Sequence, residues 1–253
     1  MSGARREKTG GDQSSAREAW FATTQWHIVL AAGHHSDPHS RAALETLCRT
    51  YWYPLYFYLR RSGYDVEDAE DLIQGFFAHM LDGSMLRGLT PHGGRFRSFL
   101  LTSLKHHLAH EREKACAQKR GGGRSLLPLD VASAETLYAR ASSQPLSADQ
   151  FYAQRWAETL LERALDRLRD LYVRAGKEDL FEGIEGLLTS ADSVEGTYQE
   201  RGRRLGMSEG AVKVAVHRLR ARFGDCLREE VAQTVSDPEE IDDEMRELLS
   251  WQR

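Results

Sequence analysis

The most informative part of the chain reads YQERGRRLGMSEGAVKVAVHRLRARF, residues 198–223. Its pattern predicts a short helix that ends at Leu205 and a tight turn at Gly206, because glycine adopts the left-handed conformation at low steric cost. Ser208 is a favourable N-cap for a second helix. At about 100° per residue, four apolar residues of that helix share one face and should be buried. They are Val212, Val216, Leu219 and Phe223. Two helices joined in this way are typical of a helix-turn-helix motif.

The other side of the second helix is cationic, as a helix that enters the major groove of DNA requires. Lys213 and Arg218 are the best placed to contact base edges, and His217 lies on the same side. Arg220 and Arg222 flank them and are expected to bind phosphates, which position a helix without reading sequence. The alternative is an ordinary basic surface helix whose charges are only solvated.

Two residues of the first helix depart from the usual helix-turn-helix pattern. Gly202 indicates close packing between the two helices. Arg201 replaces an aliphatic residue, so its side chain must snorkel toward solvent or distort the core.

A second informative stretch reads DVEDAEDLIQGFFAHML, residues 65–81. Asp65 should cap a helix in which apolar residues recur at helical spacing. Acids crowd its first two turns, where the helix dipole favours negative charge. The simplest interpretation is a set of surface acids matched to the dipole. The functional interpretation is an acidic face, with Gln74 at its end, that docks onto a basic partner.

A third stretch reads GGRFRSFLLTSLKHHLAHEREKACAQKRGGG, residues 93–123, and predicts a basic helix over about 96–118. Its charge comes from Arg97, Lys105, His106, His110, Arg112, Lys114, Lys119 and Arg120. A basic helix interleaved with aromatic residues suits DNA whose bases are partly unstacked, since cations hold the backbone and rings accept bases. Phe96 and Phe99 are nevertheless more often core residues, so the basic side is the stronger indication.

Helical patterns dominate the whole chain and strand signals are nearly absent, so we predict an all-α fold of two helical modules. The expected parts are a flexible N-terminus (1–20), a first module (21–120), a linker (121–147), a second module (148–235) and an acidic tail (236–253). The expected helices outside the quoted stretches cover about 41–62, 148–175 and 180–188, and the last helix should run over 208–235. Pro54 predicts a kink or break in the helix expected over 41–62. The tail could shield the basic helix or bind a regulator.

The composition is that of a globular protein, with 41% hydrophobic and 28% charged residues in a chain of 253. The net charge is -4, yet residues 95–124 hold eight Lys and Arg against two acids, and 201–222 hold seven against one. Such segments can bind a phosphate backbone even in a mildly acidic protein. There is no run of roughly 20 apolar residues and no signal-peptide pattern, and three cysteines are scattered. We therefore expect a cytoplasmic protein with no membrane partner.

In this order, the three stretches resemble a bacterial RNA polymerase sigma factor of the extracytoplasmic-function type. DAEDLIQGFF is similar to the polymerase-clamp-binding helix of sigma region two, and FRSFLLTSLKHHL to the helix that melts and reads the minus-ten element. GMSEGAVKVAVHRLRARF resembles the region-four helix that reads the minus-thirty-five element. The blocks FATTQWHIVLAAG, AQKRGGG and LREEVAQTVSDPEEIDDE look like a subgroup common in planctomycetes and verrucomicrobia. The resemblance covers residues 21–244.

The resemblance implies that the partners are core RNA polymerase and promoter DNA, with an anti-sigma factor or other regulator as a further candidate. The residues that would meet the coiled coil of the largest polymerase subunit are Asp68, Asp71 and Gln74. Those that would contact DNA near the start site are Lys105, Arg112, Lys119 and Arg120, with Arg97 on the same helix. Those that would contact the upstream element are Lys213, His217 and Arg218.

The chain departs from the family pattern at three places. Gly75 replaces a common glutamate and removes one docking charge. The usual asparagine of the melting helix is absent, with His106 and His107 nearby, and Arg201 replaces an aliphatic residue. Because that asparagine is absent, the minus-ten preference of the family cannot be transferred to this chain.

Two other functions compete with this interpretation. The first is a helix-turn-helix transcriptional regulator that never touches polymerase, against which the acidic helix and the second basic region argue. The second is a His-rich metalloprotein, because His106 and His110 stand four apart, near Glu111 and Cys116. HHLAHE is not the zincin pattern HExxH, and DNA-facing or surface histidines are commoner. We therefore expect no metal site, no cofactor and no catalytic activity of the chain's own.

Overall fold

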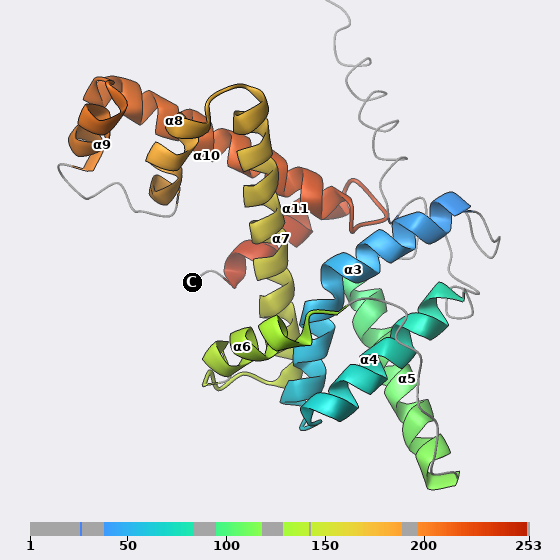
Figure 1. Cartoon of the computed structure of the whole chain (residues 1–253). Coiled ribbons are helices and arrows are strands. Elements are labelled where there is room, and N and C mark those ends of the chain that lie inside the picture. Colours follow the sequence, from blue (N-terminus) through green and yellow to red (C-terminus); the bar gives the residue numbers. More distant parts are fainter. Residues whose placement is uncertain are drawn as a thin grey trace, which may run out of the picture. The chain divides into compact units, whose positions relative to one another are not determined.

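The computed structural model describes residues 26, 38–82, 95–117, 129–141, 143–188 and 197–251. Its helices are α3 (Pro38–Arg61), α4 (Val66–Leu81), α5 (Phe96–Ala117), α6 (Val131–Ala141), α7 (Ala148–Arg174), α8 (Glu178–Ile184), the 3-10 helix η2 (Glu185–Leu187), α9 (Thr197–Leu205), α10 (Glu209–Ala232) and α11 (Glu240–Ser250) (Figure 1). Within these ranges every regular element is helical, which confirms the all-α prediction.

The chain forms two compact units that differ from the expected modules. The first unit comprises residues 1–159 and 232–253, and the second comprises residues 160–231. The C-terminal segment therefore belongs to the first unit, although we expected it to be a separate tail. Two helices were not predicted at all: α6 lies inside the expected linker, and α11 lies inside the expected tail.

The core of the first unit is built on α3, which packs against α4, α5 and α6 (Figure 1). Helix α3 continues through Pro54, so of the expected kink or break the break does not occur, and Figure 1 shows that the helix bends along its length. The fully buried residues of α4 and α5 include Ile73, Phe76, Phe77, Phe96, Leu100 and Leu104. The ring of Trp26 lies 4.9 Å from that of Phe96. Burial of these large apolar side chains stabilises the packing of α5 in the first unit.

Side-chain hydrogen bonds fasten α6 to α3. Arg60 Nε donates to Glu135 Oε1 at 2.7 Å, and the Tyr56 hydroxyl donates to the same oxygen at 2.8 Å. The hydrogen bond from Arg60 lowers the pKa of the Glu135 carboxyl, which keeps it ionised and paired. Arg61 Nε donates to the carbonyl oxygen of Leu146 at 2.9 Å. The second half of the expected linker is thus part of the first unit, whereas residues 121–128 lie outside the described residues.

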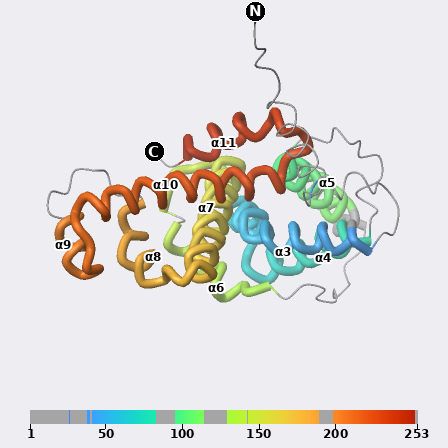
Figure 2. The backbone as a smooth tube through the Cα atoms, turned by 90° about the horizontal axis from the view of Figure 1, so that it is seen from above, coloured from blue at the N-terminus to red at the C-terminus, as the bar shows by residue number. Residues whose placement is uncertain are grey.

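The C-terminal segment joins the first unit through its backbone as well as its side chains. The Phe96 amide donates to the carbonyl oxygen of Thr234 at 2.7 Å, and the Trp26 amide donates to that of Gln233 at 3.2 Å. Thr234 and Val235 are fully buried. Figure 2 traces this segment from the end of α10 into α11. The segment is therefore a folded element of the first unit.

The second unit contains α8, η2 and α9 together with parts of α7 and α10. Helix α8 packs against α9. In α10, Val212, Val216 and Leu219 are buried, as the helical spacing predicted, and Phe223 is half-buried. This buried stripe fixes which side of α10 faces solvent.

Candidate nucleic-acid interface

The turn between α9 and α10 has the geometry that the sequence predicted. Gly206 adopts a positive φ of 66°, which only glycine reaches without strain. The Met207 amide donates to the carbonyl oxygen of Gly202 at 2.8 Å. The Ser208 hydroxyl oxygen accepts from the Ala211 amide at 3.2 Å, which confirms the predicted N-cap. The turn and the start of α10 are thus defined by local interactions.

Gly202 is required by the close approach of the turn to α9. A Cβ atom at this position would lie 2.6 Å from the carbonyl oxygen of Met207, which is closer than real Cβ atoms come to any neighbour. The predicted close packing at Gly202 is therefore confirmed. Arg201 is half-buried, and its Nη2 lies 3.6 Å from where a Cβ of Gly186 would be. The head group of Arg201 therefore packs beside η2.

The solvent-facing edge of α10 carries the predicted base-contacting residues. Lys213, His217 and Arg218 are all exposed, and Val214 between them is 50% exposed. Lys213 lies four positions before His217, and Val214 four positions before Arg218, so the four side chains lie on adjoining solvent-facing positions of the helix. Lys213 Nζ pairs with Glu209 at 2.7 Å, and this hydrogen bond raises the pKa of the lysine, which stays protonated. Among the described residues, no ion pair or hydrogen bond engages the side chains of His217 or Arg218.

The two flanking arginines are engaged within the second unit. Arg220 is half-buried, and its Nη2 donates to the carbonyl oxygen of Leu187 at 2.9 Å, which ties α10 to η2. The Arg222 guanidinium is exposed and lies 5.5 Å from the centre of the Tyr172 ring. Arg222 remains accessible to a phosphate, whereas Arg220 has a structural contact that a phosphate would have to share or replace.

The predicted cations of α5 contact other parts of the first unit. Arg97 is paired with carboxylates of α11 and its side chain is only 12% exposed. Lys105 Nζ lies 2.8 Å from Asp149 Oδ2, and Arg112 Nη2 donates to the Tyr64 hydroxyl at 2.8 Å. Lys119 and Arg120 lie outside the described residues. Phe96 is fully buried, in agreement with a core role, and Phe99 is half-buried.

The acidic face of α4 is shorter than expected. Asp65 caps the helix through a hydrogen bond of 2.8 Å that its Oδ1 accepts from the Asp68 amide. Asp68 and Asp71 are exposed, but Gln74 is buried, at 8% exposure, and does not share their surface. Gly75 is half-buried, and a Cβ there would lie 3.7 Å from His107 Nε2. A partner that docks on α4 would therefore meet Asp68 and Asp71 without Gln74 in this conformation.

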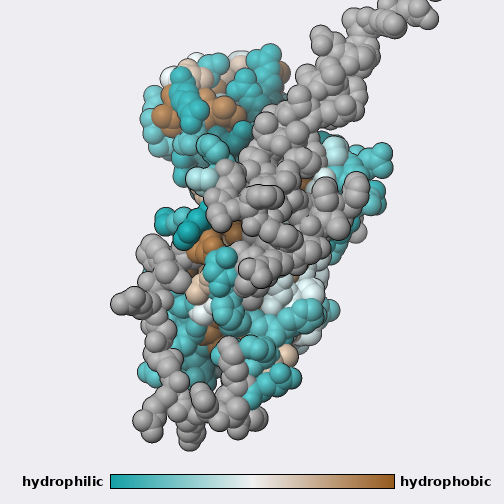
Figure 3. Space-filling view, turned by 90° about the vertical axis from the view of Figure 1, so that its right-hand side faces the viewer, coloured by the Kyte–Doolittle hydropathy of each residue, from teal (hydrophilic) through white to brown (hydrophobic). Residues whose placement is uncertain are grey.

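Among the coloured residues in Figure 3, hydrophilic ones predominate and apolar ones form smaller areas. None of the described helices combines the length and the apolar character needed to cross a membrane. In the described part of the chain, no three His, Cys, Asp or Glu side chains are grouped as metal ligands would be. His106 and His110 are exposed on α5.

No family model matches this chain, and neither does any curated protein or solved structure. Its function therefore has to be inferred from the arrangement of its own residues.

Proposed function

We propose that this protein is a sigma factor of the extracytoplasmic-function type, which directs RNA polymerase to specific promoters. The observation that carries this proposal is the exposed edge of α10, with Lys213, His217 and Arg218 presented behind a tight turn. An α-helix fits the major groove, and bidentate cationic side chains recognise base edges there. The buried stripe of Val212 and Val216 holds this edge outward.

The first unit supports the polymerase part of the proposal. Asp68 and Asp71 form an exposed anionic surface at the start of α4, and α5 follows α4 in the sequence as the basic helix. Acidic surfaces of this kind guide the docking of a basic partner, here the clamp coiled coil of the largest polymerase subunit. The first unit would dock on polymerase and open the start-proximal element, and the second unit would read the upstream element.

The test is transcription in vitro with core polymerase and a pool of genomic promoters. The intact chain should direct initiation at a defined subset, and Lys213→Ala/Arg218→Ala should reduce that initiation by at least about tenfold, because base-edge contacts carry discrimination. The matched control is Arg174→Ala/Lys177→Ala, which removes two exposed cations of the same unit outside α10. The control should transcribe like the parent chain.

Co-purification with core polymerase separates this function from a regulator that acts alone. Both double variants should bind core polymerase as the parent does, because the docking surface lies on α4. A chain that binds DNA but neither co-purifies with core polymerase nor starts transcription would contradict the proposal and favour the independent regulator.

A further inference from the structure

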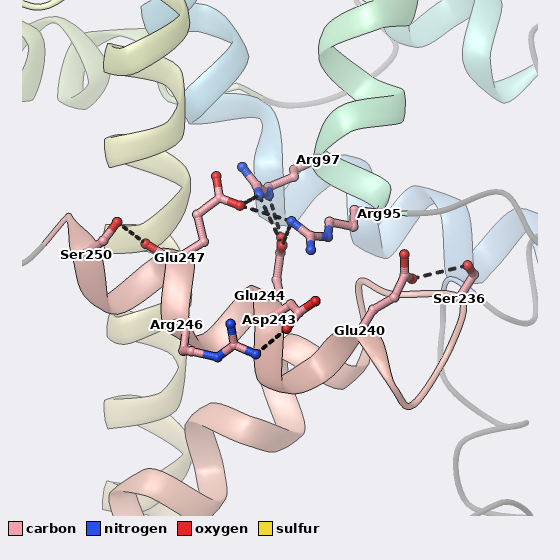
Figure 4. A network of polar contacts seen from close by, with 9 residues as sticks. All are labelled: Arg95, Arg97, Ser236, Glu240, Asp243, Glu244, Arg246, Glu247 and Ser250. Atoms are coloured by element: carbon pink, nitrogen blue, oxygen red, sulfur yellow. Dashed lines mark hydrogen bonds and ion pairs between the residues drawn. The ribbon is translucent and has the colours of Figure 1, made fainter.

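Two arginines at the start of α5 are held by two glutamates of α11 (Figure 4). Arg95 Nη1 lies 2.9 Å from Glu244 Oε2 and 3.0 Å from Glu247 Oε2. Arg97 binds both carboxylates as well, through Nε to Glu244 and through Nη2 to Glu244 and Glu247. The guanidinium of Arg97 also lies 5.2 Å from the centre of the Trp156 ring. The four charged groups therefore form one closed network.

Burial distinguishes this network from ordinary surface ion pairs. The Glu244 side chain is 0% exposed and that of Arg97 is 12% exposed. Glu244 lies on the buried face of α11 between Ile241 and Leu248, which are themselves buried. A buried carboxylate is stable only where cations and hydrogen bonds compensate its charge. The arginines therefore hold α11 in place, and α11 covers the arginines.

The arginine pair has the chemistry of a phosphate-binding site. A guanidinium offers parallel donors that match the oxygens of a carboxylate or of a phosphate equally well. A phosphodiester could replace the carboxylates without leaving either arginine unpaired. Residues 237–247 carry seven acids and one basic residue, so DNA at this site would also repel α11. Docked α11 and bound DNA therefore exclude each other.

We propose that Arg95 and Arg97 form a phosphate-binding site for nucleic acid, and that α11 is its built-in competitor. The first unit engages a phosphate backbone at this site only when α11 leaves it. The inference rests on the proposed function in taking DNA as the ligand. It assigns to α11 the control of access to the start of α5.

The first test measures the affinity of the full-length chain for a short DNA duplex of random sequence over a range of salt concentrations. Glu244→Gln/Glu247→Gln weakens the hold of α11 and should tighten binding by at least about tenfold, because the competent state becomes populated. The dependence of log affinity on log salt should steepen by about two, because each of the two arginines then neutralises one phosphate. Adding Arg95→Ala/Arg97→Ala to this variant should abolish both the tighter binding and the steeper salt dependence.

The matched control is Asp242→Asn/Asp243→Asn, which makes the same change in net charge on the exposed face of the same helix. It should change affinity by less than about twofold, since solvent screens exposed charges. Equal tightening in the control, or no tightening in the glutamate variant, would overturn the proposal. A second readout needs no substitution: hydrogen exchange of the α11 amides in the parent chain should accelerate when DNA is added. Unchanged protection of α11 at saturating DNA would also overturn it.

These outcomes are separate from those of the proposed function. If Lys213→Ala/Arg218→Ala abolishes promoter-specific transcription while Glu244→Gln/Glu247→Gln leaves DNA affinity unchanged, the sigma-factor proposal stands and the competitor role of α11 is wrong. If the glutamate variant tightens DNA binding but the chain starts no transcription with core polymerase, the site stands and the sigma-factor proposal is wrong.

Discussion

Helix α5 and helix α10 are both rich in cations, but they present them differently. On α5, Arg97, Lys105 and Arg112 each contact an acidic or phenolic group of the first unit. On α10, His217 and Arg218 are exposed, and Lys213 pairs only with Glu209, one turn earlier on the same helix. A basic segment in a sequence therefore does not by itself indicate an open binding surface. Its accessibility depends on where the compensating acids fold.

The largest expected effect concerns the buried ion pairs between the arginines at the start of α5 and the glutamates of α11. Glu244→Ala should lower the free energy of unfolding of the first unit by about 3–5 kcal/mol, because it removes the fully buried carboxylate that compensates Arg97 and leaves only the half-exposed Glu247 to pair with this buried cation. Residues 160–231, which form the second unit, contain no tryptophan, so tryptophan fluorescence during urea unfolding does not report on that unit. Arg246→Ala, which breaks an exposed pair with Asp243 on the same helix, should cost less than about 1 kcal/mol. Equal costs would mean that α11 is not held by the buried network.

A smaller effect on stability is expected in the turn between α9 and α10, which positions the exposed cations of α10. Gly202→Ala forces a Cβ against the Met207 carbonyl oxygen and should destabilise the second unit by about 1–3 kcal/mol. The loss should appear in the unfolding transition followed by circular dichroism but not in the tryptophan fluorescence transition. Gly210→Ala is the control, because a Cβ there meets nothing within 4 Å and alanine favours a helix. A tolerated Gly202→Ala would contradict the close approach.

The smallest expected effect on stability concerns Lys105, a cation of α5 whose ion pair is exposed, unlike those of Arg97. Lys105 and Asp149 form an ion pair with side chains that are 42% and 57% exposed. Asp149→Asn should therefore change the free energy of unfolding by less than about 1 kcal/mol, as for other exposed pairs. Fluorescence-detected urea unfolding measures this change. A cost as large as that of Glu244→Ala would show that Lys105 is held as firmly as Arg97.

Local patterns in the sequence predicted the helix-turn-helix well. Helix α9 ends at Leu205 as predicted, and Gly206, Ser208 and the stripe of α10 behave as expected, because each depends on neighbours within a few residues. The apolar spacing also located α4, α5 and α7 to within about one residue. These features require no knowledge of distant contacts.

The features that the sequence could not reveal depend on distant contacts. Helix α11 carries Ile241, Met245, Leu248 and Leu249 at helical spacing, so the helix itself could have been predicted, but its docking through Glu244 onto Arg97, 147 positions away, could not. Helix α6 (VASAETLYARA) is rich in helix formers and is capped by Asp130, so local signals could have located it, but its attachment to α3 through Arg60, 75 positions from Glu135, could not be predicted. Gln74 lies one position from the fully buried Ile73, and packing decides that it is buried. Charge patterns alone cannot show which acids and bases pair.

The central claim is that the cations of α10 are accessible whereas Arg97 of α5 is covered. The most direct test is the modification of arginines by a dicarbonyl reagent, with and without promoter DNA. Mass spectrometry measures the reactivity of each arginine separately. Arg218 should react quickly in the free protein and be protected by the DNA, whereas Arg97 should react slowly in the free protein and quickly once Glu244 and Glu247 are both replaced by glutamine. Equal reactivity of Arg97 and Arg218 in the parent chain, or an Arg218 that DNA does not protect, would contradict this account.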